Sequence, residues 1–86
     1  MSLHHYYVQV FMLGFGLVTR YYADIAPPGE GEVMNLRKIS EMVGVRKVLR
    51  VERTLSKDKD KEGSDIEVVE ILLGKDDIRR IDYEGL

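Results

Sequence analysis

The chain has 86 residues, the size of one small domain, and 44% of them are hydrophobic, which is ample for a core. It contains no cysteine, so disulfides and thiolate metal sites are excluded. Charged residues make up 33% of the sequence, while Gln9 and Asn35 are its only side-chain amides. This bias is typical of thermophilic proteins, and we expect an archaeal or viral source.

The net charge of −2 conceals an uneven distribution. Segment 37–57 contains seven basic and two acidic residues, whereas the rest of the chain contains six basic and thirteen acidic ones. Such a basic segment predicts contacts with the phosphates of DNA or RNA. The candidate nucleic-acid-binding residues are Arg37, Lys38, Arg46, Lys47, Arg50 and Arg53. The alternative is a solvated strand face whose charges pair with Glu67 and Glu70 on a neighbouring strand.

The most apolar stretch of the chain runs from Tyr6 to Ile25. In an extended chain its side chains are largely apolar on both sides, so we expect protein to cover both faces. A Gly-Phe-Gly sequence interrupts it, which predicts either one bent strand or two strands at about 5–13 and 17–25. Because a chain of this length buries only about 60–65% of its surface, the surplus of apolar residues indicates a homo-oligomer.

Residues 1–5 are expected to be a frayed terminus. His4 and His5 are adjacent and would point to opposite sides of an extended chain, so they predict no metal site. A membrane helix is the rival interpretation of the apolar stretch, but its strongly apolar part, residues 8–18, is shorter than the roughly 20 residues that a span requires. A charged leader is also missing, and we expect a cytoplasmic protein with no membrane partner.

A break rich in proline and glycine at 26–31 precedes a predicted helix at about 32–43. Leu36, Ile39 and Val43 have helical spacing, and a glycine follows where helices commonly end.

Residues 36–45 resemble the first helix and turn of a helix-turn-helix motif, with Ser40 and Gly44 at the small and glycine positions. The resemblance implies DNA binding, and the hairpin predicted to follow would form the wing of a winged-helix fold. The second half of the motif is not matched, because Arg50 and Arg53 stand where the recognition helix requires apolar residues.

The C-terminal half predicts two strands, 45–56 and 66–73, joined into an antiparallel hairpin by the charged, mobile loop 57–65. The tail, residues 75–86, predicts a short helix or a strand. From the first of the two strands, the side chains expected in the core are Leu49, Val51 and Leu55. On the second strand, the apolar side chains that share one face are Val69, Ile71 and Leu73.

The charged loop also resembles the first half of an EF-hand calcium loop, through Asp58, Asp60, Glu62 and Gly63. Val69 occupies the position where that motif requires a bidentate glutamate, so we expect a solvated loop and no calcium.

Together these elements predict an α+β fold in a single domain, with a small sheet, one main helix and the order β(β)-α-β-β before the tail. No catalytic set, cofactor or small-molecule substrate is indicated, because the histidines lie at the terminus and no serine has an evident base. We therefore expect a non-enzymatic, oligomeric binding module that contacts nucleic acid through 37–57. The alternative is a structural or protein-interaction module that assembles by strand pairing of the apolar N-terminal stretch.

Overall fold

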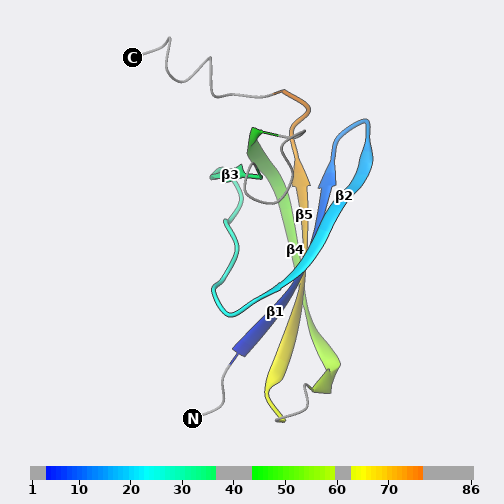
Figure 1. Ribbon diagram of the computed structural model, residues 1–86, viewed down its shortest axis with the longest axis vertical. Helices are drawn as coiled ribbons and strands as arrows, with labels where there is room; N and C mark the ends of the chain where they lie inside the picture. Colours follow the sequence, from blue (N-terminus) through cyan, green and yellow to red (C-terminus); the bar gives the residue numbers. More distant parts are fainter. Residues whose placement is uncertain (1–3, 37–43, 60–62, 77–86) are drawn as a thin grey trace.

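The computed structural model describes residues 4–36, 44–59 and 63–76. Within these ranges the chain forms one curled, five-stranded sheet of order β2-β1-β5-β4-β3 (Figure 1). β1 and β5 are parallel neighbours, and the other three pairs are antiparallel. The strands are β1 (His4–Met12), β2 (Gly16–Ala23), β3 (Val33–Asn35), β4 (Val45–Lys59) and β5 (Asp65–Leu73).

The prediction of an α+β fold with one main helix is wrong. The described residues contain no helix, and the start of the predicted helix at 32–43 is instead β3, which pairs with the beginning of β4. The rest of that predicted helix and the tail beyond Asp76 lie outside the described residues. Residues 33–35 are extended because they pair with the long neighbouring strand β4, which local sequence does not reveal.

The same finding overturns the helix-turn-helix resemblance, because β4 occupies the positions of the recognition helix. It also overturns the membrane-helix interpretation, since the apolar stretch forms strands. No helix that could cross a membrane is present among the residues that the structure describes.

The apolar N-terminal stretch is two strands rather than one, folded back at its glycines into the β1–β2 hairpin. The Phe15 amide donates to the Met12 carbonyl at 3.0 Å, and Gly14 between them has a φ of +79°. A positive φ at this position is the geometry of a type II turn, which favours glycine. The terminus is not frayed from residue 4 onward, because β1 begins there and His5 Nδ1 lies 2.8 Å from an Asp24 carboxylate oxygen.

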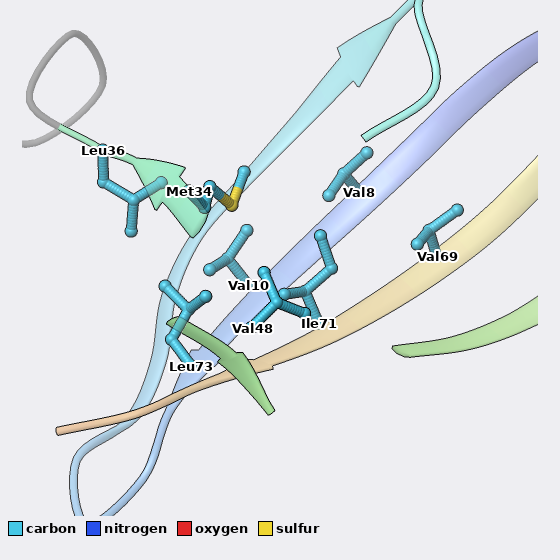
Figure 2. Close-up of a cluster of buried hydrophobic side chains, with 8 residues drawn as sticks. All are labelled: Val8, Val10, Met34, Leu36, Val48, Val69, Ile71 and Leu73. Atoms are coloured by element: carbon cyan, nitrogen blue, oxygen red, sulfur yellow. The ribbon is translucent and has the colours of Figure 1, made fainter. Parts of the chain in front are cut away.

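The core lies on one side of the sheet and is formed by eight fully or almost fully buried side chains (Figure 2). β1, β5 and the start of β4 supply the sheet side of this cluster, and the segment containing β3 lies over it. The members are Val8, Val10, Met34, Leu36, Val48, Val69, Ile71 and Leu73. The predicted shared face of β5 is thereby confirmed, since its three apolar residues are all buried.

On β4 the predicted core residues are partly wrong. The register moves from Val48 opposite Leu73 to Arg50 opposite Leu72, so Leu49 is an extra residue in a β-bulge. The bulge exchanges the faces of the strand, which buries Val48 and leaves Leu49 39% exposed. Val51 packs against the core as predicted. Leu55, at 61% exposure, lies beyond the core.

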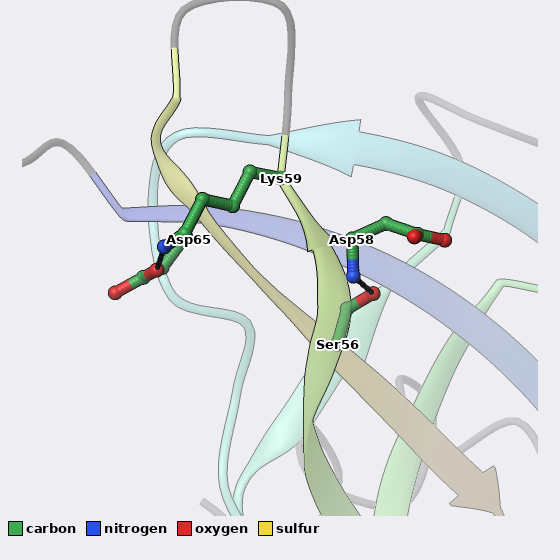
Figure 3. A network of polar contacts seen from close by, with 4 residues as sticks. All are labelled: Ser56, Asp58, Lys59 and Asp65. Carbon is green, nitrogen blue, oxygen red and sulfur yellow. Dashed lines mark hydrogen bonds and ion pairs between the residues drawn. The ribbon is translucent and has the colours of Figure 1, made fainter.

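Both ends of the charged segment predicted as a mobile loop are strand. β4 continues to Lys59 and β5 begins at Asp65, and these two residues form a cross-strand ion pair (Figure 3). The Asp58 amide donates to the Ser56 hydroxyl oxygen at 3.1 Å. Asp60 and Glu62, two of the residues resembling a calcium loop, lie outside the described residues. Among the described residues, no group of three or more His, Asp or Glu side chains is placed to hold a metal ion.

Candidate interaction surface

The side of the sheet opposite the core, called here the open face, is the candidate site. Residues directly opposite one another on neighbouring strands point to the same side, so the register defines its rows. Three rows run across β2, β1, β5 and β4 in that order. The turn row contains Leu17, Phe11, Leu72 and Arg50; the charged row contains Arg20, Gln9, Glu70 and Glu52; the tyrosine row contains Tyr22, Tyr7, Val68 and Thr54.

Two of these rows are mainly apolar, yet no described segment covers them. Tyr22 is 74% exposed and Leu17 is 44% exposed, while Phe11, Tyr7 and Leu72 are half-buried by their neighbours in the sheet. The rings of Tyr7 and Tyr22 lie 4.8 Å apart at an interplanar angle of 34°, so they form one continuous aromatic surface. Burial on both faces of the apolar stretch was predicted, and among the described residues only the core face is buried.

The charged row is polarised from one edge of the sheet to the other. Arg20 is exposed at the β2 end, and Glu70 and Glu52 lie directly opposite each other at the β5 and β4 end. Gln9 stands between them on β1, opposite both Arg20 and Glu70. Arg50 Nη2 lies 2.5 Å from Glu52 Oε1 along β4, which neutralises one of the two adjacent carboxylates. The row therefore has a basic end and an acidic end.

A groove of about 550 Å³ opens on this face beside the β1–β2 turn. Its apolar lining comes from the end of β1, the turn and β5, and its charged lining comes from Arg50 and the acidic end of the charged row. The side chains that matter most are Phe11, Phe15, Leu72, Arg50, Glu52 and Glu70. An apolar wall beside a carboxylate pair suits an apolar segment that also carries a positive charge.

The predicted basic site is not gathered at one place. Arg50 is on the open face, whereas Arg53 lies opposite Val69 and so points to the core side of the sheet. Lys47 shares a side of the β3–β4 ladder with the exposed Val33.

Arg46 lies on the opposite side of that ladder, with the buried Met34, and its guanidinium donates to the Lys75 carbonyl. Arg37 and Lys38 lie outside the described residues. The alternative prediction was that Glu70 pairs with a basic side chain on the neighbouring strand. Its cross-strand neighbour is instead Glu52.

The sequence did not predict that Arg20, Glu52 and Glu70 lie in one row on the same face. Their only signal was that Arg20 is one of two charges in an otherwise apolar stretch, and the bulge and the parallel β1–β5 pairing hid the rest. Comparison with known proteins finds no matching family model, no similar curated protein and no similar solved structure.

Proposed function

We propose that this protein is a small, non-enzymatic interaction module that assembles with copies of itself through the open face of its sheet. The observation that carries the proposal is the pair of apolar rows on a side that no described residue covers. Contiguous apolar surface of this kind marks interaction sites in small proteins. A second copy would supply the second covering layer that the apolar stretch requires. We propose further that the module acts in the cytoplasm, as expected from the sequence.

Packing by faces explains the geometry better than strand pairing by β1. β1 has β2 on one side and β5 on the other, so both of its edges are occupied. The edge of the N-terminal hairpin is β2, which carries a register shift near its turn and the charged Arg20. Bulges and charges on edge strands disfavour pairing with another chain. Two sheets that pack face to face bury both inner faces at a spacing of about 10 Å.

The area of the open face is sufficient for a modest interface. β1 has nine residues, and at about 3.3 Å per residue with four strands about 4.8 Å apart the face covers roughly 500–600 Å². Two copies would together bury on the order of 1,000 Å², which is near the lower limit for a specific interface. We therefore expect assembly that weakens on dilution.

Nucleic-acid binding is the second candidate. It is favoured by one observation, the aromatic pair of the half-buried Tyr7 and the exposed Tyr22 on the same face as Arg50, whose side chain is 69% exposed. Bases stack on such rings while cations meet the backbone. The adjacent carboxylates Glu52 and Glu70 oppose it, which ranks it below self-assembly.

Light scattering over a dilution series, followed by gel shifts with mixed-sequence DNA and RNA, separates the two candidates. Self-assembly predicts a particle of about twice the 9.9 kDa chain mass that dissociates when Phe11 is changed to Glu. The matched control is Leu55→Glu, which places the same charge at an exposed apolar residue outside the open face. A wild-type monomer at every concentration would refute self-assembly. A salt-sensitive shift that is lost in Arg50→Glu would support nucleic-acid binding.

A further inference from the structure

The charged row crosses the whole open face, and its polarity limits how two copies can meet. Its basic end is Arg20 on β2, and its acidic end is the pair Glu70 and Glu52 on β5 and β4. Face-to-face packing of two identical sheets can use a twofold axis that runs either along the strands or across them. The two axes bring different strands together, so the charges of the charged row meet in different combinations under each axis.

We propose that two copies pack open face to open face about a twofold axis parallel to the strands, so that Arg20 of each copy meets Glu52 of the partner subunit. This inference rests on the proposed function and specifies its geometry. An axis along the strands places β2 of one copy over β4 of the other, and therefore sets the basic end of one row on the acidic end of the other. An axis across the strands places β2 over β2 and sets Arg20 against Arg20, which is repulsive.

The apolar rows agree with the first arrangement. The same axis places Phe11 over Leu72 of the partner subunit and Tyr7 over Val68 of the partner subunit, so apolar side chains of β1 meet those of β5. Aligned sheets are rotated by about 30° relative to each other, which moves the ends of a row of this width by about 4 Å. Arginine and glutamate side chains are long enough to accommodate that displacement.

The test uses two charge reversals that should each prevent self-assembly and should restore it when mixed. In Arg20→Glu, the new carboxylate faces Glu52 of an identical partner. In Glu52→Arg, the new guanidinium faces Arg20 of an identical partner. Each variant alone is expected to raise the dissociation constant on the order of tenfold or more. An equimolar mixture should form heterodimers, because Glu at 20 then meets Arg at 52 and the remaining wild-type Arg20 and Glu52 also meet.

Rescue by mixing separates contact between subunits from contact within a chain, because an internal pair would be restored only in the double variant. The matched control is Arg53→Glu, a charge reversal next to Glu52 on the opposite side of β4, which should leave assembly unchanged. Assembly is measured by sedimentation at low and high salt, and the effect of the reversals should shrink at high salt. Far-ultraviolet circular dichroism confirms that each variant is folded.

Two outcomes would overturn this inference alone, and a third would overturn the proposed function with it. If Phe11→Glu prevents assembly but the mixed reversals do not restore it, the open face is used with another geometry. If Arg20→Glu binds wild type more tightly than wild type binds itself, the axis runs across the strands, because the new carboxylate then faces Arg20 of the partner subunit. If the wild-type protein never assembles, the proposed function itself fails, and the twofold with it.

Discussion

Glu52 and Glu70 lie directly opposite each other on neighbouring antiparallel strands. Like charges in this position destabilise a sheet, and only Glu52 has a described cationic partner, Arg50. Two adjacent carboxylates do not help an isolated chain to fold. In the proposed dimer, Arg20 of a second copy would bring a further cation to this pair.

Replacing Glu70 with Gln should stabilise the single subunit, because it removes the repulsion with little change in volume. We expect a gain of about 0.2–1 kcal/mol in the free energy of unfolding, measured in urea at a concentration where only monomer is present. Glu30→Gln, in the exposed loop before β3, is the control and should have no effect. A loss of stability in Glu70→Gln would show that its carboxylate is stabilised within the chain.

Shortening Ile71 should be costly, since it is fully buried at the centre of the core. We expect Ile71→Val to lower the free energy of unfolding by about 0.5–1.5 kcal/mol and Ile71→Ala by about 2–5 kcal/mol. Thermal unfolding measures both, and the milder variant remains informative if the other does not fold. Leu55→Ala removes a similar side chain from an exposed site and should change stability by less than about 0.5 kcal/mol. Equal effects at the two residues would contradict this description of the core.

In the β1–β2 turn, the effect of a substitution on stability should depend on backbone conformation alone. Gly14 has a φ of +79° and Gly16 a φ of +108°, and an added Cβ at either would meet no atom within 4 Å. Asn tolerates the left-handed region better than Ala, so Gly14→Asn should cost less stability than Gly14→Ala. At Gly16 both substitutions should cost about 1–3 kcal/mol, because that φ lies outside the left-handed well. Chemical denaturation of the four variants would show whether this ranking holds.

Stability should decline at alkaline pH through Tyr21, which packs against the core and whose pKa is raised by burial. The folded chain holds the phenol proton more tightly than the unfolded chain, so this contribution is complete below the unfolded pKa of about 10. It is lost as the pH rises through the folded pKa. Unfolding free energies measured from pH 8 to 11 should fall less steeply for Tyr21→Phe than for wild type. If the two proteins lose stability equally steeply, Tyr21 is not the cause of the decline.

The alternation of apolar and polar residues predicted much of the sheet but not how its strands pair. Ile71 and its apolar neighbours on β5 were assigned correctly because an unbroken strand alternates with period two. Leu49 was misassigned because a bulge shifts that period by one residue, and no residue type announces it. Met34 was placed in a helix because the long neighbouring strand that pairs with its segment is invisible in a short window. The charged row was not predicted, since its members come from four strands whose order depends on the parallel pairing.

The parallel pairing of β1 with β5 joins the first and the last of the described strands at the centre of the sheet. A nascent chain that has emerged only as far as β4 therefore lacks the neighbour that β1 needs. Pairing between segments so far apart in the sequence slows folding and prolongs the exposure of aggregation-prone intermediates. We therefore expect the apolar side chains of β1 to stay exposed during synthesis until β5 has been made.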